Sequence, residues 1–354
     1  MGNKVFREIS ERRRFFSWNK LSNRALNKFE IWLRRSRLSS YPHFVVVEPC
    51  NICNLKCPLC ITGQRLPVER GTMRMETFIR IIDQLSPYVR YMSLYYLGEP
   101  LFCKHLPEMI SYARRHKIRI FLSSNLNILD EKMAEDLIES KLDYLIVSLD
   151  GTTQESYEKY RVGGDFDKVI NNLRLIIDKK IQKNTPYPRI VIQPVILKHN
   201  EQEVPKLSAL ADSLGVKMFI RQGMLGGEGH SPPVTKDHAL ARKWLSQNRK
   251  YHKDYDYLSD KPYLKTEPCF YLWKAVAINW DGTVFPCCWL YENKYSVGNI
   301  MEQDFETIWN NEVYVSSRSL FARRKSTFLK SSRNLPKTIC YRCKIFRHNL
   351  NEQQ

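Results

Sequence analysis

The sequence predicts an α/β protein in which a partial (β/α)6 parallel barrel precedes a small cysteine-rich domain. Short apolar runs alternate with helical stretches from residue 43 to residue 221, and this alternation is typical of a parallel sheet. Glycines and prolines then interrupt the pattern at 222–234. Beyond this interruption the composition changes, and five cysteines fall within 269–343. We therefore expect two folded units, the larger one first.

Six strand and helix units follow one another in the first unit. Strands are expected at 43–48, 91–97, 118–124, 143–150, 189–197 and 216–221, and helices near 75–85, 106–116, 131–139, 165–182 and 201–214. The strands are short apolar runs, as in parallel sheets that are buried on both faces. Six units are consistent with an open or partial barrel.

The N-terminal segment predicts a basic amphipathic helix. Within residues 1–40, an apolar stripe recurs at three- and four-residue intervals and consists of Trp18, Leu21, Ala25, Phe29 and Trp32. Lysines and arginines fall mostly between these positions. We expect the stripe to pack on the main domain, and the alternative is docking on a membrane surface or a partner.

The whole chain is long enough for a sizeable core. It has 354 residues, of which 43% are hydrophobic and 26% are charged, as in ordinary globular proteins. We divide it into the helical segment 1–40, the barrel 41–222, a linker or insertion 223–262 and a C-terminal domain 263–354.

The net charge of +19 belongs mostly to the two ends of the chain. Residues 1–40 hold 11 Lys and Arg against 3 acids, and residues 314–354 hold 10 against 1. The middle is nearly neutral, so a basic groove for nucleic acid is not indicated. The basic ends could contact an anionic surface such as a membrane.

The cysteine content points to metal or redox chemistry. The sequence has no apolar run of membrane-spanning length and no signal-peptide pattern at 1–16. We therefore expect a cytoplasmic protein, with peripheral membrane attachment as an option. Because thiols stay reduced in the cytoplasm, its ten cysteines are not expected to form disulfides.

Four cysteines gather in the stretch EPCNICNLKCPLC, directly after the first expected strand. Active sites of parallel α/β sheets lie on such loops. The spacing Cys53-x3-Cys57-x2-Cys60 lets one loop wrap one corner of an iron–sulfur cluster. A structural zinc site normally uses paired CxxC units, and the three motif cysteines include one such unit, Cys57-x2-Cys60.

This CxxxCxxC motif resembles the signature of the radical S-adenosylmethionine (SAM) superfamily. The resemblance implies that Cys53, Cys57 and Cys60 bind three irons of a [4Fe-4S] cluster, whose fourth iron takes the amino and carboxylate groups of SAM. One electron then cleaves SAM to a 5′-deoxyadenosyl radical that abstracts a substrate hydrogen. It also implies an external one-electron reductant of the flavodoxin or ferredoxin type. Cys50 precedes the motif and is expected to be a buried free thiol.

Further positions extend the resemblance over residues 41–220. LGEP at 97–100 matches a GGEP-like element that meets the methionine amino group in the family, which makes Gly98 and Glu99 candidates. Leu97 stands where the family has its first glycine. Arg161 matches an arginine that pairs with the SAM carboxylate, a role that suits a planar guanidinium. The alternative for Arg161 is a helix-capping or surface position.

Two strand ends offer groups that could bind the ribose of SAM. SSN at 123–125 and SLDG at 148–151 close the third and fourth strands. The candidates are Ser123, Asn125, Ser148 and Asp150. The alternative is that Asp150 and Gly151 only form a turn.

The second group of cysteines resembles the C-terminal SPASM or shorter twitch extension of the same superfamily. The resemblance implies an auxiliary [4Fe-4S] cluster that moves electrons and is held by Cys269, Cys287, Cys340 and Cys343. Zinc is the alternative metal. Cys288 follows a ligand where sulfatase-maturing relatives have an aspartate base, and it is a candidate catalytic residue. It could act on the substrate, serve as an alternative ligand or have no role.

The expected function is that of a radical SAM oxidoreductase that abstracts a substrate hydrogen and passes an electron to the auxiliary cluster. A small sugar or aminocyclitol, or a lipid-linked molecule presented by residues 1–40, is the preferred substrate, because that segment is too short for a leader-peptide-binding domain. The alternatives are a peptide- or protein-modifying maturase and a non-catalytic iron–sulfur or zinc protein. Retention of LGEP, SLDG and Arg161 argues against the last.

Overall fold

The computed structural model describes residues 15–63, 68–222, 238–246, 248–251, 255–256, 261–262, 268–321 and 335–343. The predicted boundary at 222–234 and most of the predicted linker lie outside the described residues. The domain limits therefore stay predictions.

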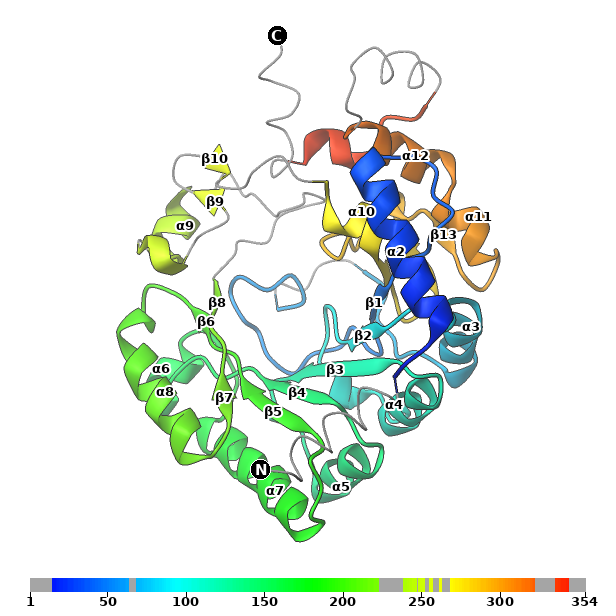
Figure 1. The fold of residues 1–354 in the computed structure, drawn as a ribbon. Helices are drawn as coiled ribbons and strands as arrows, with labels where there is room; N and C mark the ends of the chain where they lie inside the picture. The colour runs from blue at the N-terminus through cyan, green and yellow to red at the C-terminus, as the bar shows by residue number, and fades with distance from the viewer. Residues whose placement is uncertain are drawn as a thin grey trace.

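One nine-stranded sheet runs through the molecule in the order β13-β12-β11-β1-β2-β3-β4-β5-β7 (Figure 1). Its parallel strands from the barrel are β1 (Phe44–Val47), β2 (Tyr91–Leu94), β3 (Arg119–Ser124), β4 (Tyr144–Val147), β5 (Arg189–Ile192) and β7 (Lys217–Met218). β7 and β13 lie at the two ends of the order, so the sheet does not close. The predicted partial barrel is confirmed.

Helices form a layer outside the curved sheet (Figure 1). They are α3 (Met75–Leu85), α4 (Leu106–Arg115), α5 (Glu131–Glu139), α6 (Gln154–Glu158), α7 (Phe166–Gln182) and α8 (Val204–Ser213). Each longer helix turns an apolar stripe inward, as on α3, where Phe78, Ile81, Ile82 and Leu85 are fully buried. Asp130 and Asp165 cap α5 and α7 by accepting from Met133 N and Lys168 N. The five predicted helices are confirmed, and α6 is additional.

The fifth predicted strand, 189–197, divides into β5 and β6 (Val195–Ile196). Pro194 lies in the break, because it has no N–H to donate to a ladder. Its carbonyl accepts from Arg221 N at 2.8 Å. β6 pairs with β8 (Arg221–Gln222), so the predicted sixth strand is divided too.

The C-terminal part extends the barrel sheet. β11 (Ala275–Ile278) pairs in parallel with β1, and β12 (Thr283–Phe285) and β13 (Gly298–Asn299) continue antiparallel. A hairpin turn joins β11 to β12, and Gly282 in this turn has φ +88°. Its helices are α10 (Phe270–Lys274), α11 (Phe305–Trp309) and α12 (Glu312–Ser319).

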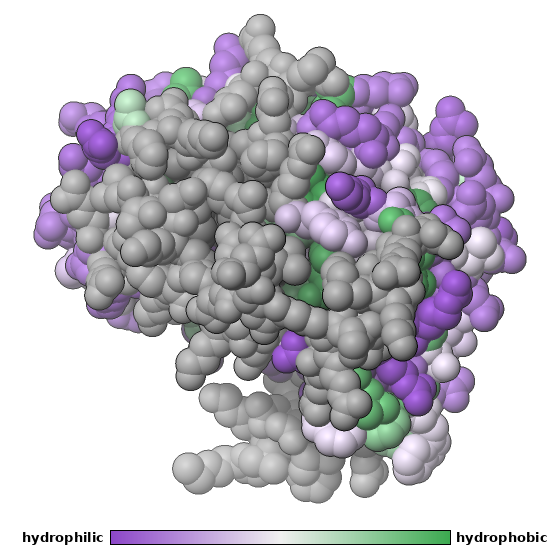
Figure 2. All heavy atoms as spheres, turned by 90° about the horizontal axis from the view of Figure 1, so that it is seen from above, coloured by the Kyte–Doolittle hydropathy of each residue, from purple (hydrophilic) through white to green (hydrophobic). Residues whose placement is uncertain are grey.

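Smaller elements complete the described chain. They are α9 (His238–Trp244), the antiparallel pair β9 (Tyr255–Asp256) and β10 (Lys261–Pro262), and 3-10 turns at Pro100–Phe102, Glu201–Glu203, Arg249–Tyr251, Asn293–Tyr295 and Ile339–Arg342. Seen from above, the described surface is mostly hydrophilic, with small hydrophobic patches between (Figure 2). None of the helices in the described part of the chain combines the length and apolar character that a membrane crossing needs.

The N-terminal helix α2 (Trp18–Leu33) has the reverse of the expected orientation. The prediction that its apolar stripe packs on the main domain was wrong, because Trp18, Phe29 and Trp32 are exposed. The buried face is polar instead and consists of Lys20, Asn23, Asn27 and Glu30.

Candidate active site

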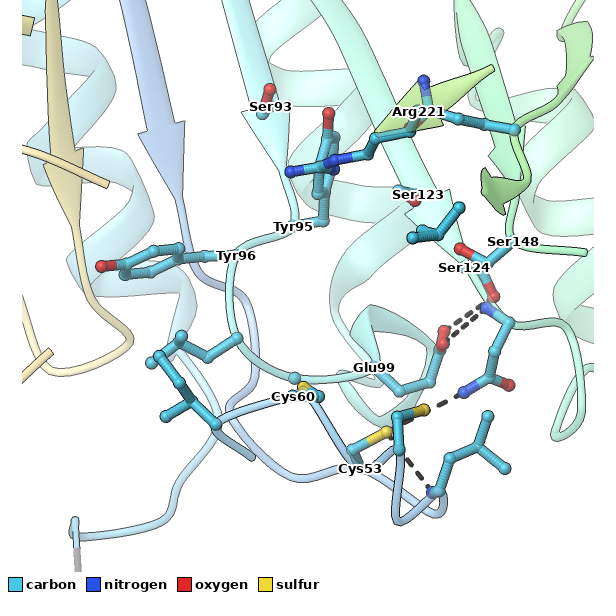
Figure 3. A pocket seen from close by; sticks show the side chains of 18 of the residues that line it. Cys53, Cys60, Ser93, Tyr95, Tyr96, Glu99, Ser123, Ser124, Ser148 and Arg221 are labelled. Carbon is cyan, nitrogen blue, oxygen red and sulfur yellow. Dashed lines mark hydrogen bonds between the residues drawn. The ribbon is translucent and has the colours of Figure 1, made fainter. Parts of the chain in front are cut away.

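A cavity of about 390 Å³ lies where the parallel strands end, and both parts of the chain line it. Cys53, Cys57 and Cys60, from the loop after β1, form one side of it. Figure 3 shows Cys53 and Cys60 on this loop below Glu99, with Ser123 and Ser148 at neighbouring strand ends. The position matches the expectation that the carboxyl ends of parallel strands carry the site.

The cysteine loop is held by backbone hydrogen bonds to two other loops, one after β2 and one after α6. Glu99 N donates to Ile52 O at 2.8 Å, and Lys56 N donates to Val162 O at 2.9 Å. A Cβ at Gly98 would lie 2.1 Å from Cys50 O, so only glycine allows this approach. Gly98 also lines the cavity. This predicted residue therefore shapes the loop as well as the cavity wall.

Hydrogen-bond donors point at two of the three motif sulfurs. Leu55 N lies 3.4 Å from Cys53 Sγ, and Asn125 Nδ2 lies 3.9 Å from it. Arg161 Nη1 lies 3.9 Å from Cys57 Sγ. In the cluster-free chain, burial raises the pKa of Cys53 to about 12 and of Cys57 to about 11. Donors at sulfur favour the thiolates that a cluster needs and tune its potential, so this set fits a three-cysteine cluster.

Glu99 uses its carboxylate within the protein. It is almost fully buried, and it accepts from Ser124 Oγ at 2.7 Å and from Asn125 N at 2.8 Å. It also accepts from Leu101 N at 3.3 Å. Burial raises the pKa of Glu99 to about 7. The carboxylate thus joins the ends of β2 and β3, and Asn125 is held where its amide reaches Cys53.

Asp150 lies behind the cavity, where it holds Arg161. It is fully buried and pairs with Arg161 Nε, while its other oxygen accepts from Val195 N at 2.6 Å. Arg161 lines the cavity beside Cys57, but Asp150 does not line it. The ribose contact of Asp150 stays a prediction, and its carboxylate positions an arginine. Ser123, Asn125 and Ser148 do line the cavity.

Sequence reasoning missed several cavity residues. Ser93, Tyr95, Gln193, Arg221, Tyr271 and Trp289 all line the cavity. Figure 3 labels Arg221 and Tyr95 among the side chains that line the cavity. The signal for Tyr95 was its place at the end of a strand just before LGEP. Arg221 had no such signal, because the break at Pro194 brings it to the cavity.

The C-terminal part contributes a wall of this cavity. Tyr271, Cys288 and Trp289 belong to it, and Cys288 Sγ is hydrogen-bonded to Tyr271 Oη at 2.7 Å. Hydrogen bonds from Cys287 and Tyr271 hold the pKa of the Cys288 thiol below its ordinary value. Tyr96 reaches the same part by donating to Leu290 O.

A second, smaller cavity of about 20 Å³ brings the other cysteines together. Its lining contains the four predicted auxiliary ligands, Cys269, Cys287, Cys340 and Cys343. Apolar side chains of Leu272, Leu290 and Phe321 complete the wall. Four thiols in an apolar shell fit a fully thiolate-bound cluster. No group of three or more His, Cys, Asp or Glu within the described ranges is close enough to hold a single metal ion.

Cys50 is buried outside both cavities. Its sulfur accepts from Ile52 N at 3.3 Å and lines neither cavity. Its surroundings are those of a buried free thiol.

Comparison with known families agrees with this geometry. A family model for the radical SAM superfamily matches residues 47–211. The chain is a radical SAM enzyme. A second model, for the iron–sulfur cluster-binding SPASM domain, matches residues 269–344 of this radical SAM enzyme. Its first domain binds a [4Fe-4S] cluster and SAM, and its SPASM domain binds auxiliary iron–sulfur clusters.

Curated relatives span most of the radical SAM enzyme at low identity. A tungsten-containing aldehyde ferredoxin oxidoreductase cofactor-modifying protein of Pyrococcus furiosus is 23% identical over 302 residues, covering 77% of this chain and 82% of the relative. Fe-coproporphyrin III synthase of Methanosarcina barkeri is 26% identical over 294 residues, covering 73% and 71%. Other relatives are named as peptide cyclases and maturases.

The fold agrees with a solved structure of this kind. The structure of Streptococcus suis SuiB bound to S-adenosylmethionine matches with a TM-score of 0.61 and 17% identity. The match covers 84% of this chain and 72% of that chain. At this identity the likeness concerns the fold alone.

Proposed function

We propose that this radical SAM enzyme oxidises a small polar substrate, of the sugar or aminocyclitol type, in the 390 Å³ cavity. One observation carries the proposal. Cys288 lines this cavity, and its chain neighbour Cys287 lines the second cavity with the other auxiliary cysteines. A substrate that contacts Cys288 therefore lies one residue away from an auxiliary ligand.

The cysteines have separate tasks in this proposal. Cys53, Cys57 and Cys60 hold the SAM-binding cluster, and Cys269, Cys287, Cys340 and Cys343 hold the auxiliary cluster. When bound, these groups supply hydrogen-atom abstraction driven by SAM cleavage and a place for the electron that remains. Arg161, fixed by Asp150, would hold the SAM carboxylate, and Ser123 and Ser148, which line the same cavity, would bind other parts of SAM.

The balance of the oxidation is that of an alcohol converted to a carbonyl. The substrate would lose one hydrogen atom to the 5′-deoxyadenosyl radical, which becomes 5′-deoxyadenosine, one electron to the auxiliary site and one proton to water. An external one-electron reductant of the flavodoxin or ferredoxin class supplies the electron that cleaves SAM. We place this chemistry in the cytoplasm, where the reducing environment keeps ten cysteines as thiols.

The size and lining of the cavity support a small polar substrate. A volume of about 390 Å³ is near the lower end for ligand sites, and SAM must share it. Ser93, Gln193 and Arg221 supply polar groups for hydroxyl or anionic substituents.

Modification of a peptide side chain is the second candidate. It is favoured by relatives named as maturases and peptide cyclases. A single side chain entering from the mouth would also fit the remaining space. A lipid-linked substrate is less favoured, because α2 lies at the opposite edge of the sheet from the cysteine loop.

Anaerobic reconstitution with iron and sulfide tests the proposal. About eight irons per chain and formation of 5′-deoxyadenosine on reduction with SAM are expected. About four irons with one zinc would overturn the auxiliary electron acceptor. Polyol and aminocyclitol substrates can then be compared with candidate peptides by substrate-dependent acceleration of SAM cleavage.

A further inference from the structure

The face of α2 that points to solvent is its apolar face. Trp18 is 76% exposed, Phe29 is 50% exposed and Trp32 is 60% exposed. Leu21 is 38% exposed and lies on the same side, at the spacing of one helix face. Phe29 and Trp32 stack with ring centroids 6.1 Å apart. An exposed aromatic face of this extent is typical of an interaction surface.

Specific hydrogen bonds fix the opposite face of α2 against the protein. Lys20 Nζ donates to His116 O at 2.9 Å and to Lys117 O at 2.8 Å. Asn23 and Tyr41 exchange two hydrogen bonds, from Asn23 Nδ2 to Tyr41 O at 3.0 Å and from Tyr41 N to Asn23 Oδ1 at 2.8 Å.

The second half of the helix is fixed in the same way. Asn27 Nδ2 donates to Trp273 O at 2.7 Å and to Ser40 Oγ at 2.9 Å. Glu30 accepts from Ser39 N at 2.7 Å and from Ser40 N at 3.1 Å. Turning the helix to bury its aromatics would leave these buried backbone groups without partners, at a cost for each. The outward aromatic face is therefore built into the fold.

The exposed charges on α2 and on the residues that directly follow it are all positive. Arg24, Lys28, Arg35 and Arg37 are exposed. The single acid within residues 15–40 is Glu30, which is buried and bonded to the chain. Arg34 Nη1 donates to Phe321 O at 3.1 Å. Aromatic rings bordered by lysine and arginine are the composition of helices that lie in the interface of anionic membranes.

We propose that α2 docks the enzyme on an anionic lipid surface, with Trp18, Leu21, Phe29 and Trp32 in the interface and Arg24 and Lys28 at the headgroups. This inference does not depend on the proposed oxidation. It concerns a surface, and the reaction concerns the cavity at the other end of the strands.

The attachment points of α2 set the orientation of the docked enzyme. Tyr41, Lys117 and Trp273 come just before β1, β3 and β11, so α2 crosses the amino-terminal edge of the sheet. It lies against α10 there (Figure 1). The cysteine loop follows β1 at the carboxyl edge. A membrane-docked enzyme therefore turns its cavity away from the lipid, and the substrate enters from the aqueous side.

Vesicle flotation with the reconstituted holoenzyme tests the proposal. The protein is expected to float with vesicles of phosphatidylcholine containing about 30% phosphatidylglycerol, and not with phosphatidylcholine alone. Trp18→Ser/Phe29→Ser and, separately, Arg24→Glu/Lys28→Glu are each expected to lower the partition coefficient at least tenfold. Ile181→Ser/Met301→Ser is the matched control, because it removes two exposed apolar side chains elsewhere and should bind as the wild type does.

Two outcomes would overturn the proposal. One is wild-type enzyme that does not float with the anionic vesicles, or floats no better than Trp18→Ser/Phe29→Ser. The other is self-association of the wild type, lost in that variant, without vesicle binding, which would assign the face to a second copy. SAM cleavage, measured in parallel, should match the wild type in every variant, so a failure of docking and a failure of the reaction are told apart.

Discussion

Cys287 and Cys288 are consecutive residues whose side chains line different cavities. Cys287 lies with Cys269, Cys340 and Cys343, and Cys288 lies with Tyr271 on the wall of the larger cavity. The short segment they form therefore separates the proposed auxiliary site from the proposed SAM site. In the proposed reaction, an electron would therefore pass over a short distance from a substrate beside Cys288 to the auxiliary cluster beside Cys287.

Iron content should distinguish these neighbours. Cys287→Ala is expected to leave about four irons per chain, because the auxiliary cluster loses a ligand. Cys288→Ala, its matched control, is expected to keep about eight. Iron and sulfide counting after anaerobic reconstitution measures both. If Cys288→Ala loses iron and Cys287→Ala retains it, Cys288 is the auxiliary ligand and Cys287 is not.

Asp150 should control SAM binding through Arg161. Asp150→Asn is expected to weaken SAM binding at least tenfold, because Arg161 loses the carboxylate that holds it beside Cys57. Removing one partner of a buried ion pair also costs about 3–5 kcal/mol of stability, so a lower melting temperature is expected. Equilibrium binding of SAM to the reconstituted variant measures the first effect.

The control for this prediction is Glu158→Gln, an exposed carboxylate on nearby α6. It should bind SAM as the wild type does. Unchanged SAM affinity in Asp150→Asn would show that Arg161 needs no carboxylate partner, and would exclude a role of Asp150 in SAM binding.

The fold and the cysteines could be predicted because their signals are local. The alternation of strands and helices, the CxxxCxxC loop and the later cysteine spacing need no knowledge of distant contacts. The division of the strand at Pro194 was visible in the sequence only as a proline, and its effect on Arg221 depends on the pairing of β6 with β8.

The errors concern residues whose role depends on distant partners. The hydrophobic pattern of α2 favours burial of its aromatic stripe. The interleaved polar stripe is buried instead, because Lys20 and Asn27 find carbonyls of residues 116, 117 and 273. Asp150, whose expected ribose contact stays a prediction, also pairs with an arginine eleven positions along the chain that its own motif did not indicate. The spacing of residues along the sequence does not indicate these partners.

Gly98 should be irreplaceable for the cysteine loop. Gly98→Ala places a Cβ against Cys50 O and Asn51 Cα, and both are backbone atoms that cannot move without shifting the loop. We expect the SAM-site cluster to be lost and the iron content to fall to about half. Gly215→Ala is the control, because a Cβ there meets nothing within 4 Å although φ is +66°. It should lower the melting temperature slightly and keep all the iron, whereas full iron in Gly98→Ala would mean that the loop adapts.

Glu48 should make the stability of the fold depend on pH. It is fully buried at the end of β1, its Oε1 accepts from Leu97 N at 2.8 Å, and burial raises its pKa to about 8. Between pH 4.5 and about 8 the unfolded chain has lost this proton and the folded chain keeps it. Stability therefore falls as pH rises through this window, by at most roughly 5 kcal/mol, and levels off above it.

Glu48→Gln should flatten this dependence, because the amide stays neutral in both states. The decline will not vanish, since Glu99, with its pKa raised to about 7, acts in the same direction. Apparent melting temperatures of the anaerobic holoenzyme between pH 5.5 and 8.5 measure the slope. Exposed Glu76 has no comparable burial, so Glu76→Gln should follow the wild type. If Glu48→Gln and the wild type lose melting temperature in parallel as the pH rises, Glu48 is ionised in the fold and its burial is offset by a partner.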